Sequence, residues 1–212
     1  MPDHVNIVFA LYPGMTQLYF AGPYEVFCRL PDATVTIASV NGGELRTQFG
    51  LTFAHLARLA AVDRCSILCV PGGTNLPITP EDPFLAEVRR LAAQASFVTS
   101  VCNGSLILGA AGLLSGVRST SHWGTLTELS KYGAIPVAER VVRDGRIVTG
   151  GGVTAGIDFA LTLAAELAGP TNAQVIQLLI EYAPAPPFNS GHPTTAPVEV
   201  MRALEGLMSQ ET

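Results

Sequence analysis

The sequence predicts an α/β fold with a doubly wound, mostly parallel sheet flanked by helices, and three observations carry this prediction. Short apolar runs alternate with helical patterns along the 212 residues, which is the order of β-α-β units. One run ends directly in Gly72-Gly73, where backbone N–H groups can approach a ligand. Another run ends at Cys102, and small residues then lead straight into an apolar helix. We therefore expect a site at the carboxyl ends of the strands, with a thiol at a strand-to-helix elbow.

The composition is that of a folded globular protein. Hydrophobic residues make up 48% of the chain and charged residues 14%, which argues against disorder, and we expect a single domain over residues 1–212. The net charge of −5 leaves no basic surface for nucleic acid. No apolar run reaches the roughly 18–20 residues of a membrane helix, and no signal-like segment opens the chain. A cytoplasmic protein that binds neither nucleic acid nor membrane is expected.

Cysteine and histidine are sparse. The chain has four of each, and the spacing Cys65-x-x-x-Cys69 fits neither a redox motif nor a zinc site. We expect no disulfide framework, no metal and no cofactor.

The strands are predicted from short apolar runs that end in turn residues. A continuous run such as Val5–Leu11 is typical of a strand buried on both faces of a parallel sheet. Gly42-Gly43 predicts a hairpin turn into a polar ribbon near residues 45–47, and Asp144-Gly145 predicts a second hairpin with a primed turn. The predicted strands cover residues 5–11, 34–40, 67–71, 97–101, 137–142 and 146–149.

The helices are predicted from apolar residues at helical spacing. In the first helix, Gly22-Pro23 predicts a restart, because proline suits a first helical turn. A later apolar helix is closed by Gly169-Pro170. Residues 183–212 begin as a proline-rich arm and are expected to lie, with a helix, on the body or on a partner subunit. The predicted helices cover residues 17–30, 83–95, 106–111, a short segment through 126–129, 157–167 and 173–182.

Cys102 is the residue around which the predicted site is organised. A side chain at such an elbow faces the free N–H groups and the positive dipole end of the next helix. Free cysteine has a pKa of about 8.5, and a helix N-terminus lowers it, so we expect a thiolate nucleophile at neutral pH. The alternative is that Cys102 is a small buried apolar residue, as many free cysteines are.

Several separated motifs resemble those of the ThiJ/PfpI superfamily, a group of class I glutamine amidotransferase-like domains, and within it those of the isocyanide hydratases. The resemblance runs over nearly the whole chain. It rests on Val70-Pro71-Gly72-Gly73, Val101-Cys102-Asn103-Gly104-Ser105, Thr120-Ser121-His122-Trp123, the segment from Gly150 to Asp158 and the segment from Glu181 to Phe188.

The resemblance implies a flavodoxin-like homodimer that acts on a small molecule. In such an enzyme the cysteine attacks the isocyanide carbon, and water resolves the resulting thioimidate to an N-formamide. Cys102 is then the nucleophile, and backbone N–H groups near Gly73 and Asn103 stabilise charge on the adduct. The residues expected to bind the substrate are Gly72, Gly73, Thr74, His122, Gly151, Gly152 and Val153.

The sequence departs from the isocyanide hydratase pattern at two positions. Tyr19 stands where that pattern has an acidic residue, and Asn103 stands where threonine is common. A phenol with a pKa near 10 donates a proton or a hydrogen bond but is a poor base at neutral pH. Tyr19 is therefore either a catalytic acid or an aromatic side chain that fills the pocket. Its presence also favours an alternative function, in which a diverged relative performs lyase, cyclisation or proton-transfer chemistry.

Two further side chains have both a functional and a structural interpretation. His122 follows the cysteine by twenty residues, where related proteins place a histidine near the thiol, yet it is equally typical of a histidine paired with backbone beside Trp123. Asp158 opens a helix and is expected to cap it or to interact with its dipole. A sensor that binds a ligand, or that responds to oxidation of Cys102, is the alternative outside enzymology.

Overall fold

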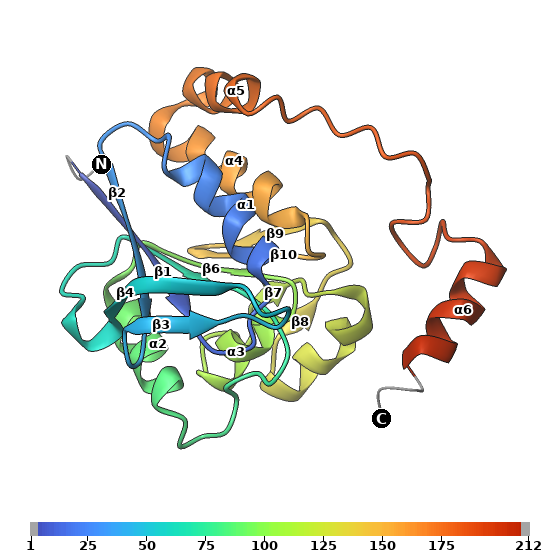
Figure 1. Cartoon of the computed structure of the whole chain (residues 1–212), viewed down its shortest axis with the longest axis horizontal. Coiled ribbons are helices and arrows are strands. Elements are labelled where there is room, and N and C mark those ends of the chain that lie inside the picture. Colours follow the sequence, from blue (N-terminus) through green and yellow to red (C-terminus); the bar gives the residue numbers. More distant parts are fainter. Residues whose placement is uncertain (1–3, 209–212) are drawn as a thin grey trace. The chain divides into compact units, whose positions relative to one another are not determined.

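The computed structural model describes residues 4–208, which form two compact units divided after Ile180. The first unit is built on an eight-stranded sheet of order β3-β4-β2-β1-β5-β6-β10-β9 (Figure 1). All neighbouring strands run parallel except the pairs β3/β4 and β9/β10. The predicted doubly wound, mostly parallel sheet is therefore confirmed. Its strands are β1 (Val5–Leu11), β2 (Ala33–Ser39), β3 (Gly43–Arg46), β4 (Thr52–Arg58), β5 (Ile67–Val70), β6 (Phe97–Val101), β9 (Val141–Asp144) and β10 (Ile147–Gly150).

Helices cover both faces of the sheet. The helices α1 (Gln17–Phe27) and α4 (Ala155–Ala168) pack together on one face, and α2 (Pro83–Gln94) and α3 (Gly104–Ala110) lie on the other (Figure 1). The remaining elements of this unit are η1 (Leu59–Ala61), β7 (Arg118–Ser119), η2 (Trp123–Tyr132), β8 (Ile135–Pro136) and α5 (Pro170–Leu179). The predicted short helix through residues 126–129 is the 3₁₀ segment η2.

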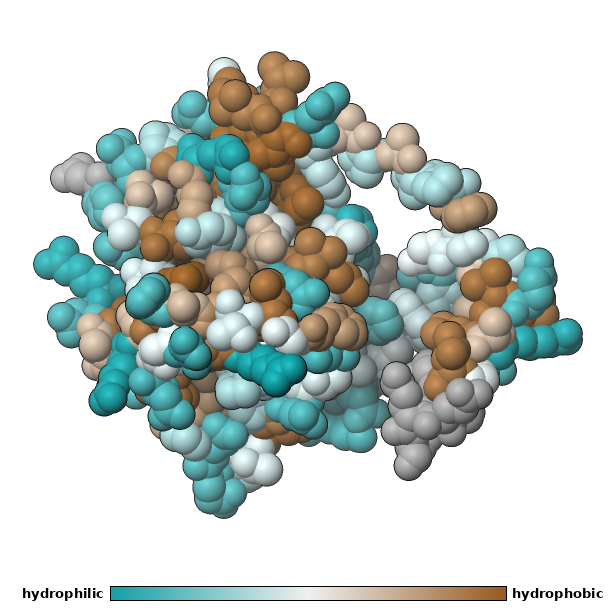
Figure 2. All heavy atoms as spheres, in the orientation of Figure 1, coloured by the Kyte–Doolittle hydropathy of each residue, from teal (hydrophilic) through white to brown (hydrophobic). Residues whose placement is uncertain are grey.

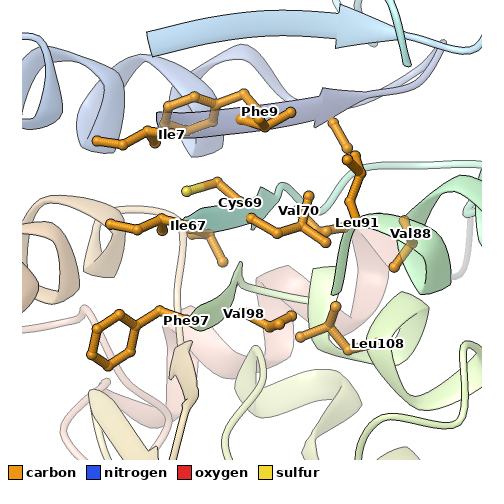
Figure 3. Packing of buried hydrophobic residues seen from close by; sticks show 14 of the residues in the cluster. Ile7, Phe9, Ile67, Cys69, Val70, Val88, Leu91, Phe97, Val98 and Leu108 are labelled. Carbon is orange, nitrogen blue, oxygen red and sulfur yellow. The ribbon is translucent and has the colours of Figure 1, made fainter. Parts of the chain in front are cut away.

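The core lies between the central strands and the two helix layers. Every residue of β5 and β6 is buried, as expected for strands covered on both faces. Figure 3 shows Phe9 of β1, Cys69 of β5 and Val98 of β6 at successive levels of this core. Burial of each large apolar side chain stabilises the fold by about 1.5–3 kcal/mol. The central strands are thus the rigid base from which the carboxyl-end loops project.

The predicted restart at Pro23 is wrong, because α1 is continuous through this residue. Proline has no N–H to donate to the carbonyl four residues earlier, which disfavours a helix interior. Packing against α4 offsets that cost. A Cβ on Gly156 would lie 2.9 Å from Pro23 Cδ, and a Cβ on Gly22 would lie 3.1 Å from Ile157 Cγ1. The Gly22-Pro23 pair is therefore the contact surface that α1 presents to α4.

The predicted hairpin at Gly42-Gly43 is also wrong, because the two strands on either side of this turn do not pair with each other. The chain does turn there, with both glycines at positive φ, but β3 pairs with β4 and not with the preceding strand. The hairpin turn lies instead between β3 and β4, where the Thr47 N–H donates to the Leu51 carbonyl at 2.8 Å. The sequence analysis missed β4 because only Leu56 is buried in this strand, which leaves no clear alternation. The second predicted hairpin, around Gly145, is confirmed.

The C-terminal part of the first unit ends in α5. The predicted final helix begins three residues earlier than expected, because Gly169 at φ 88° turns the chain and Pro170 occupies the first helical position. On α5 the side chains of Val175, Leu178 and Leu179 are exposed, and Figure 2 shows hydrophobic residues gathered over this helix. The second unit carries α6 (Val198–Met208). Whether this unit lies on the body or on a partner subunit stays a prediction.

No helix within residues 4–208 is both long and apolar enough to cross a membrane. The four cysteines are all free.

We expect the fold to lose stability in alkali because its core holds protonated thiols. Burial raises the pKa of Cys65 to about 12 and raises the pKa of Cys69 well above its ordinary value. The unfolded chain releases these protons from about pH 9 upward, whereas the folded chain keeps them. Stability is therefore fully present below pH 9 and falls as the pH rises toward 12.

Urea unfolding at a series of pH values from about 7 to 10.5 measures this effect. The double variant Cys65→Ala/Cys69→Ala should show a shallower loss of stability above about pH 9, since it lacks both protons. A free energy of unfolding that stays constant or rises across this range would contradict the expectation.

Candidate active site

Cys102 occupies the strained turn between β6 and α3. Its φ of 58° lies in the left-handed region that side chains other than glycine avoid. Hydrogen bonds hold it there: the Cys102 N–H donates to the Gly150 carbonyl at 2.8 Å, and the Cys102 carbonyl accepts from the hydroxyls of Ser105 and Ser121 at 3.1 and 3.2 Å. The expected strand-to-helix elbow is therefore present, and its conformation is fixed from both sides.

Small residues allow the ends of β5 and β6 to approach closely. A Cβ on Gly104 would lie 2.5 Å from the Val70 carbonyl oxygen. A Cβ on Gly72 would lie 2.1 Å from Asn103 Oδ1 and 3.0 Å from the Gly104 nitrogen. Because these neighbours are mostly backbone, a larger residue at either glycine would force the two loops apart.

Asn103 connects these two loops through its side-chain amide. The Gly73 N–H donates to Asn103 Oδ1 at 2.9 Å, and Asn103 Nδ2 donates to the Gly73 carbonyl at 2.9 Å. Asn103 begins α3 without a side-chain bond to its own helix. The Gly73 N–H is therefore already paired in this structure, and its expected part in stabilising charge on an adduct stays a prediction. The backbone N–H of Asn103 interacts with the Cys102 thiol instead.

We expect Asn103→Ala to destabilise the protein by about 1–3 kcal/mol, because two part-buried hydrogen bonds are lost and two backbone groups are left without partners. Urea unfolding measures the change. Asn172→Ala is the matched control, since this exposed amide makes one hydrogen bond to Ala168 at 2.6 Å, and its effect should stay under about 0.5 kcal/mol. Equal effects of the two substitutions would contradict the structural role of Asn103.

Tyr19 lies against the thiol. The Cys102 S–H donates to the Tyr19 hydroxyl oxygen at 3.2 Å, and both side chains are buried. Burial, followed by the charge of Cys102, raises the pKa of the Tyr19 phenol, so this group keeps its proton at neutral pH. When the cysteine ionises, the phenol becomes the donor of the same hydrogen bond.

The pKa of Cys102 differs from the expectation. Burial raises it above the ordinary value, and the hydrogen bonds from Tyr19 and from the Asn103 N–H lower it only in part. The sequence pattern showed a helix N-terminus, which favours the thiolate, but it did not show that 3% exposure would remove most of the water that stabilises this charge. The free protein therefore holds a neutral thiol that the phenol and the backbone N–H stabilise on ionisation.

The sequence analysis missed Tyr12 and Ser121. Tyr12 directly follows β1 at the carboxyl edge of the sheet, and its charge interacts with those of Tyr19 and Cys102, so burial and both neighbours raise the pKa of its phenol. The signal in the sequence is an aromatic residue at a strand's carboxyl end. The Tyr12 ring also lines a cavity of about 550 Å³, together with Leu11, Glu44, Asn75, Asp82 and Phe84.

Among residues 4–208, which the structure describes, no hydrogen bond joins His122 to the Cys102 thiol. Its Nδ1 accepts from the Gly124 N–H at 3.2 Å, and its ring packs at a tilt against Trp123, with 4.9 Å between centroids. Burial lowers the pKa of the His122 imidazole, which favours the neutral form. The structural interpretation of this histidine is therefore the better supported one.

The other expected site residues lie in loops beside the elbow. Thr74 binds the Gly14 carbonyl through both its N–H and its hydroxyl, at 3.1 and 3.2 Å. The Gly151 N–H donates to the Arg140 carbonyl at 2.9 Å, which places the glycine loop next to Gly150, the partner of Cys102. Gly152 has open space around its Cα, and Val153 packs partly against the core.

Asp158 has a structural role. Its carboxylate lies in the first turn of α4 and accepts from the Arg140 guanidinium at 2.8 Å, while Thr154 occupies the cap position. No cluster of three or more potential metal-ligating side chains occurs within residues 4–208.

A thiol at a strained strand-to-helix elbow, on the carboxyl edge of a doubly wound sheet, defines a class of α/β proteins with a cysteine at the elbow. The chain belongs to the DJ-1/PfpI family, whose model matches residues 5–166. It is 49% identical to an isonitrile hydratase of Pseudomonas putida over 198 residues, which are 93% of this chain and 87% of that protein. This agrees with the resemblance found in the sequence, since isonitrile and isocyanide are two names for one functional group.

Solved structures agree with this assignment. A ThiJ/PfpI family protein from Pseudomonas syringae superposes with a TM-score of 0.92 at 40% identity, over 98% of this chain and 87% of that one. Drosophila melanogaster DJ-1beta superposes with a TM-score of 0.75 at 23% identity, over 85% of this chain and its own full length, and this likeness concerns the fold alone.

Proposed function

We propose that this protein hydrates isocyanides to N-formamides through a covalent bond to Cys102. The observation that carries the proposal is the hydrogen bond between the elbow thiol and the phenol of Tyr19, because it puts a nucleophile and an acid at one point. The 49% identity to a protein described as an isonitrile hydratase supports the choice of substrate class.

The first step forms the thioimidate. The Cys102 thiolate adds to the terminal isocyanide carbon, and this carbon takes up a proton, so that the adduct contains every atom of the isocyanide and the proton of the former thiol. Tyr19 is suited to relay that proton, because its oxygen accepts the S–H hydrogen bond at 3.2 Å and its raised pKa keeps the phenol protonated: it takes up the thiol proton as it gives its own to the carbon.

The second step releases the product. Water adds to the thioimidate carbon, the electron pair of the C=N bond moves to nitrogen, and nitrogen takes the proton that water gives up. The tetrahedral intermediate then expels the Cys102 thiolate as its oxygen loses a proton and becomes the formyl oxygen. Overall, one isocyanide and one water give one N-formamide, and the thiol is regenerated.

An assay of the purified protein against a panel of alkyl and aryl isocyanides tests this proposal. Formamide that appears in step with isocyanide consumption supports it, and a preparation inert toward the whole panel would remove it. The homodimer that the family resemblance implies stays a prediction, which light scattering of the same preparation tests.

A second candidate function rests on Tyr19. A phenol replaces the carboxylate that the isocyanide hydratase pattern has at this position, and a phenol with a raised pKa is a weaker general base still. A reaction that needs only an acid beside the thiol, such as a proton-transfer or cyclisation step on another small electrophile, fits this arrangement too.

A further inference from the structure

Tyr12 carries a buried hydroxyl that the mechanism above does not use. The residue is 3% exposed, and its hydroxyl has no hydrogen-bond partner within residues 4–208. A buried hydroxyl without a partner costs free energy, whereas phenylalanine would fill the same space without that cost. The simplest explanation for a tyrosine at this position is a bound ligand that forms a hydrogen bond with its hydroxyl.

The position of this hydroxyl is defined by its neighbours. A Cβ on Gly73 would lie 3.0 Å from the Tyr12 oxygen, so the hydroxyl lies directly over the Gly73 backbone. The same backbone is held by the side chain of Asn103, the residue after the nucleophile. The Tyr12 ring is fixed from another side by Phe84, with 5.4 Å between ring centroids. The hydroxyl thus stands on the loop that borders the thiol.

Other polar groups near the thiol already have partners. The Gly73 N–H is bound to Asn103, and the Tyr19 hydroxyl accepts from Cys102. The Ser121 hydroxyl donates to the Cys102 carbonyl. Among these groups, the Tyr12 hydroxyl is the one that has no hydrogen-bond partner of any kind within residues 4–208.

We infer that Tyr12 is a second phenolic catalytic residue, whose hydroxyl donates a hydrogen bond to the nitrogen of the substrate bound to Cys102. The inference rests on the proposed function and concerns its second step. In that step the electron pair of the C=N bond moves to nitrogen, so a hydrogen bond at nitrogen makes the carbon a better target for water. The phenol is not consumed, because nitrogen takes its proton from the water that adds.

The two phenols then have different tasks. Tyr19, which contacts the sulfur, serves the formation of the adduct, and Tyr12, which lies over Gly73, serves its hydrolysis. Removing one hydroxyl at a time should therefore slow different steps of the same reaction.

Tyr12→Phe tests this division, because it deletes only the hydroxyl and keeps the ring contact with Phe84. With an alkyl isocyanide we expect kcat to fall about 10²-fold, while the rate of adduct formation in a single turnover stays within about twofold of the wild type. The Cys102 adduct should accumulate in the steady state, as mass spectrometry of acid-quenched samples measures. Tyr19→Phe should instead slow adduct formation and show no accumulation.

Tyr24→Phe is the matched control, since this tyrosine lies on α1, packs against Phe9 and Phe20, and should keep wild-type kinetics. The melting temperature of Tyr12→Phe should equal or exceed that of the wild type, because no protein hydrogen bond is lost. If the wild type is active and Tyr12→Phe turns over equally fast, the role of Tyr12 is overturned but the proposed function is not. Slower adduct formation in Tyr12→Phe, without accumulation of the adduct, would overturn that role in the same way. A wild type that forms neither formamide nor adduct would overturn the proposed function and this role with it.

Discussion

We expect Cys102→Ala to lose the proposed isocyanide hydration by about 10⁴-fold or more, because the alanine side chain has no atom that can bond to the substrate carbon. The substitution removes one weak hydrogen bond to Tyr19 and leaves the backbone contacts of the elbow in place. The folded structure should therefore persist. Initial rates of formamide production, together with the circular dichroism spectrum and the melting temperature, measure both expectations.

Cys69→Ala provides the control for this first prediction. Cys69 is a buried free cysteine on β5, in the core and not at the elbow (Figure 3). Its loss should lower stability but leave kcat within about twofold of the wild type, since no step of the reaction uses it. If Cys102→Ala retained most of the activity, or if Cys69→Ala lost as much, the assignment of the nucleophile would be wrong.

We expect Tyr19→Phe to lower turnover in the proposed reaction by about 10²–10⁴-fold, since it removes the proposed acid beside the sulfur and the hydrogen bond that stabilises the thiolate. The same substitution raises the pKa of Cys102 further. The pKa is already above its ordinary value in the wild type, so the thiolate fraction, and with it the rate of alkylation by iodoacetamide, grows as the pH rises. For Tyr19→Phe this pH–rate profile should move to higher pH.

A pH–rate profile that is identical in the wild type and in Tyr19→Phe would show that Tyr19 only fills space beside the thiol.

Tyr19→Asp distinguishes the two candidate functions. A gain of isocyanide turnover in this variant would indicate that the native protein has moved to other chemistry, and a loss would indicate that the phenol has taken over the role of the carboxylate. Thr125→Val is the control for the pH–rate profile of alkylation. It removes a hydroxyl that bonds to Ser121 and not to the thiol, so little change is expected in that profile.

The architecture was largely predictable because each central element carries a local signal. The largely apolar runs of β1 and β5 are typical of strands buried on both faces, and the small residues after Cys102 fit a tight turn. The edge of the sheet was not predictable in the same way. Strand β4 pairs through its backbone and buries little, and α1 continues through Pro23 only because α4 packs against it.

The location of the site was predictable from the sequence, but its hydrogen bonds and the pKa of its thiol were not. A sequence shows that Cys102, Asn103 and Gly73 meet at one edge, since parallel strands end together. It does not show that the Asn103 amide occupies the Gly73 N–H, nor that burial raises the pKa of Cys102. Both depend on atoms brought together from segments about thirty residues or more apart.

The central claim is that the substrate becomes covalently bound to Cys102, and rapid acid quench of the wild-type protein during turnover of an alkyl isocyanide tests it most directly. Intact-protein and peptide mass spectrometry should find Cys102 heavier by the full mass of the isocyanide, because the adduct contains all of its atoms. The added mass should be absent from Cys102→Ala. Formamide that accumulates while Cys102 stays unmodified at every time point, or an adduct on another cysteine, would contradict the account.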